Sequence, residues 1–142
     1  MNSTSAAVAG AAVFVWLGMV LAISFLEAPL KFRAPGVTIP LGLGIGRIVF
    51  RALNIAEAAL AVVVVVAVAT GGPDAGVIVP TALAVAVLAV QLGVVRPRLN
   101  RRSDRVLAGE QVPRSSAHLY YVALEVIKTV VLLVLGVLLL AV

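Results

Sequence analysis

Residues 45–57 read IGRIVFRALNIAE, and residues 60–69 continue the same segment as LAVVVVVAVA. The first stretch brings Arg47, Arg51, Asn54 and Glu57 into the opening turns of a helix whose remainder is apolar enough to lie in a lipid bilayer. A charged side chain at that depth costs about 3 kcal/mol or more. These side chains should therefore face protein, water or a ligand, and the sequence predicts a membrane helix bundle with a charged layer at one end.

The composition places the chain in the membrane class. Of the 142 residues, 63% are hydrophobic and only 12% are charged, and the mean hydropathy is +1.19. A soluble domain would be about 25% charged and about half apolar. The chain has no cysteine and one histidine, which excludes disulfides, thiolate or histidine-rich metal sites and bis-histidine haem, and we expect no cofactor.

The hydropathy pattern predicts an all-α polytopic membrane protein, an antiparallel four-helix transmembrane bundle formed by a single domain. The predicted helices span residues 6–30, 40–69, 77–95 and 116–142, and the two connections on the basic side span residues 31–39 and 96–115. Thr38 with Pro40 is expected to start the second helix, and Ser115 or Ser116 to cap the fourth.

The basic residues indicate the orientation of this bundle. The eleven Lys and Arg residues lie in the two basic connections or at the helix ends that border them, except for Lys128, which is near the same end of the fourth helix. Both termini and the connection at residues 70–76 have none. The positive-inside rule therefore predicts a multi-pass protein of the bacterial cytoplasmic (plasma) membrane, with both termini outside.

Alternating helix direction brings the polar side chains of all four helices to the same end. The predicted polar layer consists of Glu27, Arg47, Arg51, Asn54, Glu57, Gln91, His118, Tyr121, Glu125 and Lys128. The opposite half of the helices carries almost no polar side chain. The sequence therefore predicts no continuous water path across the monomer.

One interpretation of the layer is purely structural. Intramembrane charges usually pair internally, so Glu57 or Glu125 would bond to Arg51 or Lys128 and fix which helix faces meet. On this interpretation the protein is a structural or accessory membrane subunit.

A second interpretation adds a ligand. Arg47 and Arg51 lie beside Gly44 and Gly46 at the start of a helix, where free backbone donors and the helix dipole favour an anion. A phosphate, a lipid headgroup or a carboxylate would fit such a site. The segment GLGIGR matches neither the dinucleotide nor the phosphate-loop pattern, so the motif names no particular ligand.

Two further function classes start from other side chains. Glu27, Glu57 and Glu125 are the proton-coupling candidates of an exporter or channel subunit, which would exchange a proton for a cationic solute. His118, Tyr121 and Glu125 share one helix face and are the only candidates for acid/base chemistry. No nucleophile or metal constellation accompanies them, so we expect no enzyme.

The arginine-rich segment of residues 96–114 does not indicate nucleic-acid binding. It has six arginines but no aromatic residue for base stacking and no recognisable recognition fold. We interpret it as a cytoplasmic connection that follows the positive-inside rule.

Scattered aromatic, proline and glycine positions resemble those of a known family. The positions are Phe25, Pro29, Phe32, Pro35 and Gly36 after the first helix, Phe50 in the second, Pro97 after the third and His118 at the start of the fourth. Their spacing resembles a bacterial four-helix membrane family of unknown function, which is similar to the animal transmembrane protein associated with cisplatin resistance. The resemblance implies four helices and a pocket of unassigned role, and it carries over no functional residue.

The sequence thus favours a small, non-enzymatic membrane protein that binds an anionic or lipid-like ligand in the polar layer. The candidate ligand-binding residues are Arg47, Arg51, Asn54, Glu57, His118, Tyr121, Glu125 and Lys128. The expected partners are membrane lipids and further copies of the chain, because a short bundle leaves small-residue faces uncovered.

Overall fold

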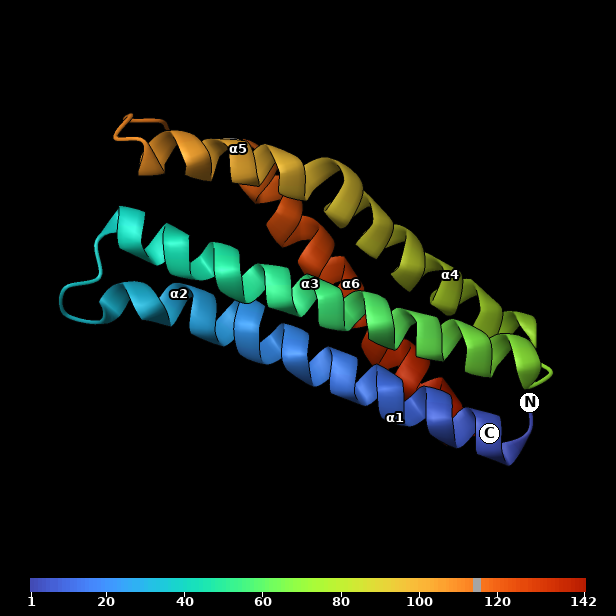
Figure 1. The fold of residues 1–142 in the computed structure, drawn as a ribbon. Helices are drawn as coiled ribbons and strands as arrows, with labels where there is room; N and C mark the ends of the chain where they lie inside the picture. Colours follow the sequence, from blue (N-terminus) through green and yellow to red (C-terminus); the bar gives the residue numbers. More distant parts are fainter. Residues whose placement is uncertain (114–115) are drawn as a thin grey trace.

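The computed structural model describes residues 1–113 and 116–142, and every long element within them is a helix. In this part of the chain four helices are long and apolar enough to cross a membrane: Ser3–Arg33, Ile39–Thr70, Ala75–Leu107 and Ser116–Leu140. They alternate in direction, and both termini lie at the same end of the molecule (Figure 1). The predicted fold class, an antiparallel four-helix transmembrane bundle, is confirmed.

Two of the long helices change their winding along their length. The first comprises α1 (Ser3–Val20), the π-helix η1 (Leu21–Glu27), α2 (Ala28–Leu30) and the 3₁₀ turn η2 (Lys31–Arg33). The second is α3 (Ile39–Thr70). The third comprises α4 (Ala75–Val90), the π-helix η3 (Gln91–Val95) and α5 (Arg96–Leu107), and the fourth is α6 (Ser116–Leu140).

Short polar side chains start three of the helices. The side chains of Asn2, Thr38 and Asp74 each accept a hydrogen bond from the backbone N–H three residues further on, at 2.8, 3.3 and 3.2 Å. Such caps satisfy donors that lack a partner within the helix. The predicted helix start at Thr38 is therefore present. Ser116 is the first described residue of α6, and the alternative cap, Ser115, lies outside the described residues.

The connection predicted at residues 96–115 is wrong over its first 12 residues, because the third helix continues to Leu107 as α5. Pro97 lies in the first turn of α5, where a missing N–H is tolerated. The residues that follow are rich in arginine and leucine, which are good helix formers. This charged segment is therefore a helical extension of the third apolar helix and not an irregular connection.

The boundaries of the first helix also differ from the prediction of residues 6–30. The helix begins at Ser3 and continues through Pro29 to Arg33. Pro29 lies inside this continuous helix, directly after the π-helix, where the regular α-helical hydrogen-bond pattern is already interrupted. The connection to α3 therefore shortens to residues 34–38, where Gly36 adopts a φ of 83°.

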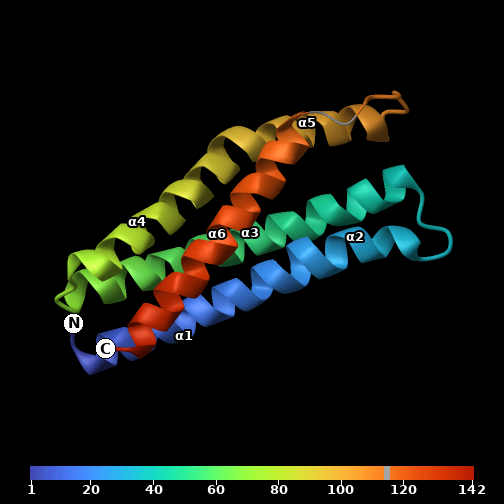
Figure 2. The same ribbon diagram turned by 180° about the vertical axis from the view of Figure 1, so that it is seen from behind.

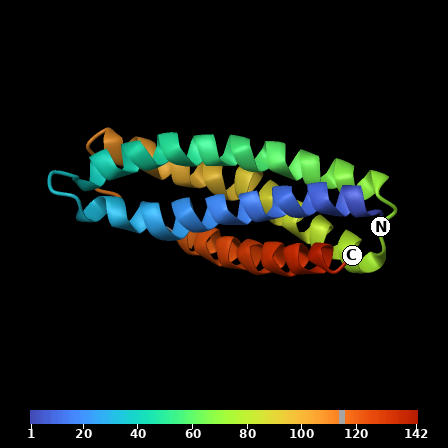
Figure 3. The ribbon, with the colours of Figure 1, turned by 90° about the horizontal axis from the view of Figure 1, so that it is seen from below.

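The helices are not parallel to one another. In Figure 3, α1 lies between α3 and α6. In Figure 2, α6 crosses the bundle obliquely, since it lies near the start of α1 at the terminal end and near α5 at the other. We call this other end, which carries the connections after Arg33 and Leu107, the basic end. The divergence of α6 from α1 separates the helices there.

The terminal half of the bundle is a tightly packed apolar core. Val13, Trp16, Val20, Leu132 and Leu135 are completely buried. Large apolar side chains elsewhere remain exposed on the outer faces of all four helices, as expected of a bundle whose surroundings are lipid.

A glycine allows close contact between α1 and α6 in this core. A Cβ atom at Gly136 would lie only 2.7 Å from Cζ of Phe14. The Phe14 ring therefore packs directly on the backbone of α6, as small residues permit at membrane helix interfaces.

Candidate functional site

A set of polar side chains is buried where the apolar core ends. We call Trp16, Ser24, Glu57, Gln91, Glu125 and Lys128 the buried polar cluster. Glu57 and Lys128 have no exposed surface, and Gln91 and Glu125 have 1% each. These side chains come from α1, η1, α3, η3 and α6, so the cluster joins all four long helices.

Lys128 is the centre of this cluster. Its Nζ atom lies 2.5 Å from Oε1 of Glu57 and 2.6 Å from Oε1 of Glu125, and it donates to Oε1 of Gln91 at 2.8 Å. Glu125 and Lys128 are three residues apart on α6 and thus share a face. One ammonium group therefore holds two carboxylates from different helices.

Neutral donors complete the coordination of the two carboxylates. Trp16 donates its indole N–H to Oε1 of Glu57 at 2.9 Å, and Ser24 donates its hydroxyl to Oε2 of Glu125 at 2.7 Å. Gln91 donates to Oε1 of Glu125 at 3.4 Å. Oε2 of Glu57 is buried without a hydrogen-bond partner among the described residues. Both oxygens of Glu125 are therefore engaged, whereas Glu57 has one free acceptor.

A cavity of about 500 Å³ lies beside this cluster, toward the basic end. It opens where α6 diverges from the other helices, and it is lined by η1, α2, η2, the first turns of α3, α5 and the start of α6. We call it the basic cavity, because its lining includes Lys31, Arg47, Arg96 and Arg102. Ser24 and Glu125 belong both to its wall and to the buried polar cluster.

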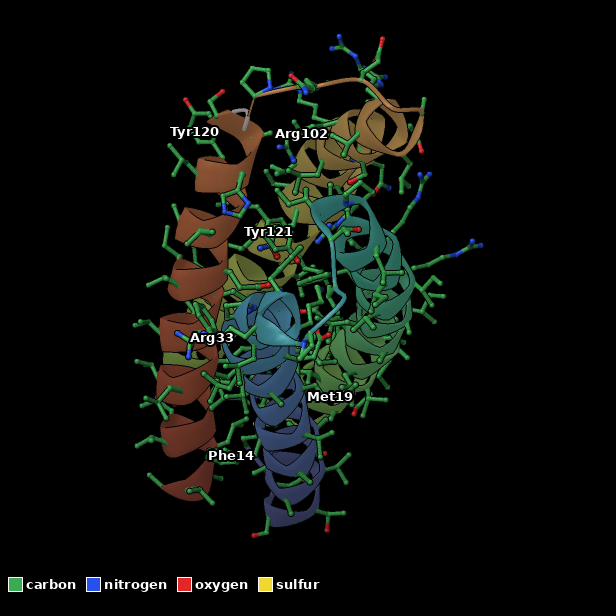
Figure 4. All side chains as sticks on the ribbon, turned by 90° about the vertical axis from the view of Figure 1, so that its left-hand side faces the viewer. Phe14, Met19, Arg33, Arg102, Tyr120 and Tyr121 are labelled. Atoms are coloured by element: carbon green, nitrogen blue, oxygen red, sulfur yellow. The ribbon has the colours of Figure 1, made fainter. Side chains whose placement is uncertain are left out.

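Aromatic rings make up much of the remaining wall. Phe25, Phe32, Phe50 and Tyr121 line the cavity. Figure 4 shows Tyr121 pointing into the space between α6 and the other helices, whereas the neighbouring Tyr120 points away from it. Their exposed fractions, 7% and 63%, agree with these directions. The cavity therefore combines positive charge with apolar and aromatic surface.

A glycine makes room for one of these rings. A Cβ atom at Gly42 would lie 2.2 Å from Cε1 of Phe32. The ring can therefore lie against the backbone of α3 only because position 42 has no side chain.

Arg96 occupies a corner formed by two aromatic rings. Its Cζ atom lies 4.6 Å from the centre of the Phe50 ring and 4.4 Å from that of Tyr121. The two ring centres are 5.9 Å apart and the ring planes are nearly perpendicular, at 89°. Both distances from Cζ of Arg96 to the ring centres are within the range of favourable cation–π contacts. The rings thus hold the guanidinium group in the wall of the cavity.

Arg51 and Asn54 do not lie in this cavity. They line a separate groove of about 530 Å³ between α3 and the η3–α5 segment, together with Arg47, Arg96 and Asn100. Arg51 is exposed there. The single polar layer expected from the sequence is therefore divided into a buried cluster, a basic cavity and an outer groove.

The predicted residues fall into these three places as follows. Glu57 and Lys128 belong to the cluster, Glu125 to both the cluster and the cavity, and Arg47, His118 and Tyr121 to the cavity. Lys128, one of the two predicted partners of Glu57 and Glu125, forms ion pairs with both carboxylates. Arg51, the other predicted partner, takes no part in these ion pairs.

The glycine part of the predicted anion site is wrong. The helix begins at Ile39, so Gly44 and Gly46 lie beyond the first turn, whose N–H groups alone lack partners within the helix. Arg47 is also engaged, since its guanidinium group bonds to the carboxylate of Asp104 on α5. Neither glycine therefore offers a free backbone donor to an anion.

The sequence analysis missed Trp16, Ser24 and Arg96. Trp16 and Ser24 are eight residues apart on the first helix, and two steps of four residues would have placed them on one face. Arg96 was assigned to a connection because it begins the run of arginines. Only the extension of the third helix puts it in the wall of the cavity.

Comparison of the chain with protein-family models, curated proteins and solved structures finds no match. The resemblance to the four-helix family therefore stays a prediction, and the functional argument depends on the geometry of the site.

Proposed function

We propose that this multi-pass membrane protein binds a small amphipathic anion in the basic cavity and has a non-enzymatic role. The observation that carries the proposal is the combination of four cationic side chains with aromatic rings around one space of about 500 Å³. Small-molecule sites in proteins have volumes of about 300–1,000 Å³ and are mostly apolar with a few polar groups. The cavity has both properties.

The charge of the cavity favours an anion over a cation. Glu125 is the acidic side chain among the described lining residues, and it is paired with Lys128 at 2.6 Å. Lys31 and Arg47 also lie beside carboxylates, those of Glu27 and Asp104, so the excess positive charge of the lining comes from Arg96 and Arg102. This excess raises the local concentration of anions.

The position of the cavity favours a ligand that comes from the membrane. The cavity lies at the end of the bundle where the arginines of residues 1–113 are found. On the positive-inside rule this is the cytoplasmic half of a bacterial cytoplasmic membrane, with both termini on the other side. An anionic headgroup at that level would meet the basic side chains, and its apolar chain the aromatic rings.

Native mass spectrometry of the protein in a neutral detergent tests this proposal. The probes are dodecanoate and the cationic dodecyltrimethylammonium, which have the same chain length and opposite charge. We expect one equivalent of dodecanoate to bind and the cation to bind far more weakly. Equal binding of both probes would contradict the proposal, because it would show simple adsorption to the apolar surface.

Two variants, each with one alanine replaced by phenylalanine, locate the bound anion. Ala28 lines the cavity, and Ala11 lies on the same long helix on the exposed face. Ala28→Phe should fill the cavity and abolish the binding of dodecanoate, and Ala11→Phe should leave it unchanged. An equal effect of the two variants would place the bound anion elsewhere.

The second candidate function is a proton-coupled exporter or channel subunit that uses Glu27, Glu57 and Glu125. It is favoured by the buried polar cluster, in which two carboxylates share one lysine and Glu125 also lines the cavity. Transport also needs a path through the terminal half, whose described core is apolar except for Thr81. Proteoliposomes loaded with a cationic dye decide between the two: dye flux that Glu57→Gln abolishes supports transport, and the absence of flux rejects it.

A further inference from the structure

We infer that Arg96, assisted by the hydroxyl group of Tyr121, is the receptor for the headgroup of the bound anion. The ligand class is a single apolar chain that ends in an oxyanion, either a carboxylate or a phosphate monoester. This inference deepens the proposed function and depends on it, since it names the side chains and the headgroup chemistry of the same cavity.

The other cations of the cavity already have partners. Arg47 pairs with Asp104, and Lys31 lies 3.7 Å from a carboxylate oxygen of Glu27 on the same helix. Arg102 donates to the backbone carbonyl groups of Val112 and Pro113, at 3.3 and 3.1 Å. Within the described residues, Arg96 is the cation of the cavity that has neither a carboxylate nor a carbonyl partner.

The donors of Arg96 are oriented but unused. Its Nε and Nη2 atoms are buried from solvent and make no hydrogen bond among the described residues, and the same is true of the hydroxyl oxygen of Tyr121. Buried donors without a partner are rare and unfavourable, and each calls for an explanation such as an unseen ion or ligand. The hydroxyl group lies within interaction range of the guanidinium group, so the two unused guanidinium donors point to one missing acceptor beside that hydroxyl group.

Neither carboxylate of the neighbouring cluster bonds to Arg96: Glu57 keeps one free oxygen but does not line the cavity. Glu125 lines the same cavity, but its Oε1 atom receives bonds from Lys128 and Gln91, and its Oε2 atom receives one from Ser24. A shift of Glu125 toward Arg96 would break these contacts. The partner that Arg96 lacks must therefore come from outside the described chain.

The chemistry of the two side chains selects an oxyanion. The planar guanidinium group presents its N–H donors as a fork, which matches two oxygens of a carboxylate or phosphate, and a phenol adds a third donor. The perpendicular rings of Phe50 and Tyr121 fix the plane of the guanidinium group. A quaternary ammonium would leave these donors unsatisfied, and a neutral alcohol would offer them a single uncharged oxygen.

The dimensions of the cavity select a ligand with one chain. Its volume of about 500 Å³ lies in the lower half of the range for drug-sized ligands, about 300–1,000 Å³. Phe25 and Phe32 line it together with the headgroup residues. One alkyl chain can therefore contact these rings while its headgroup reaches Arg96.

The test measures the binding of dodecanoate, dodecyl phosphate and dodecanol to the full chain in neutral detergent by isothermal titration calorimetry. Arg96→Gln should weaken the binding of both oxyanions by about tenfold or more, because a charge-assisted bidentate contact is lost, and should change the binding of dodecanol far less. The oxyanion whose affinity falls more in Arg96→Gln identifies the headgroup that the site prefers. Arg98→Gln is the matched control, since Arg98 is an exposed residue of α5 outside the cavity lining, and it should bind both oxyanions as the unmodified protein does.

A second variant keeps the inference testable if Arg96→Gln folds poorly. Tyr121→Phe retains the ring and removes only the hydroxyl group. It should therefore weaken the binding of both oxyanions a few-fold and reduce the ratio of their affinities to the affinity for dodecanol. Unchanged binding in both Arg96→Gln and Tyr121→Phe overturns the receptor assignment and leaves the proposed function standing. If the unmodified protein binds neither oxyanion, the proposed function itself fails, and the assignment with it.

Discussion

Replacement of Lys128 by methionine should destabilise the bundle by about 3–5 kcal/mol. Lys128 is completely buried and forms ion pairs with two carboxylates, Glu57 at 2.5 Å and Glu125 at 2.6 Å. Methionine fills a similar volume but leaves two negative charges without a counter-charge. Removal of one partner from a buried ion pair typically costs about 3–5 kcal/mol, because the other charge stays buried.

The expected magnitude distinguishes charge from hydrogen bonding. Lys128 donates to two other helices, through Glu57 and Gln91. Hydrogen bonds between membrane helices average about 0.6 kcal/mol each, so their loss alone would cost only about 1 kcal/mol. A measured loss above about 3 kcal/mol therefore identifies the uncompensated carboxylates as the cause.

Reversible unfolding in mixed micelles with increasing dodecyl sulfate provides the assay. Trp16 is the only tryptophan and donates to Glu57, so its fluorescence reports directly on the cluster. Val130→Met serves as the control on an exposed face of α6. The neutral triple variant, with Lys128→Met, Glu57→Gln and Glu125→Gln, should recover at least half of the lost stability. The reasoning is refuted if Lys128→Met unfolds like Val130→Met, or if the triple variant is no more stable than Lys128→Met.

Two further predictions concern the cavity and the topology. Gly44→Ala should stabilise α3 by up to about 1 kcal/mol, because alanine favours the helix and a Cβ atom there meets nothing closer than 4.0 Å. Gly42→Ala should not gain stability, and it should weaken the binding of dodecanoate, because the new Cβ atom displaces the ring of Phe32. Identical unfolding curves and identical dodecanoate affinities for Gly42→Ala and Gly44→Ala would contradict this prediction. The chain has no cysteine, so single-cysteine variants at Gln111 and Val142 can report the topology: a membrane-impermeant maleimide added to intact cells should label position 142 and not position 111, and the reverse pattern would invert the predicted orientation.

Periodicity and hydropathy were sufficient to predict the architecture. Long apolar runs define the four membrane helices, and the three-residue spacing of Glu125 and Lys128 predicts that they share a face. The same reasoning included Lys128 among the candidate partners of Glu57. These predictions succeed because they depend on the helical repeat and on the cost of burying a charge, both of which are local properties of the sequence.

The division of the polar residues could not be predicted in the same way. Arg51 shares a stripe with Arg47, but periodicity does not say which neighbouring helix faces that stripe. The answer depends on the extension of the third helix as α5, which brings Arg96 beside α3 and provides Asp104 as the partner of Arg47. A sequence rich in arginine is equally compatible with an irregular connection and with a helix that extends beyond the bilayer.

The two π-helices, η1 and η3, give the chain a simple way to change its interior. A turn of π-helix takes in about one more residue than an α-turn, and each residue of an α-helix corresponds to a rotation of about 100°. Deletion of one residue from η1 would restore regular winding and remove the widened turn, so the stretch of wall that includes Phe25 would change shape while the helix on either side keeps nearly the same faces. Relatives that differ in length by a single residue at these two places would thus be expected to hold differently shaped ligands on the same scaffold.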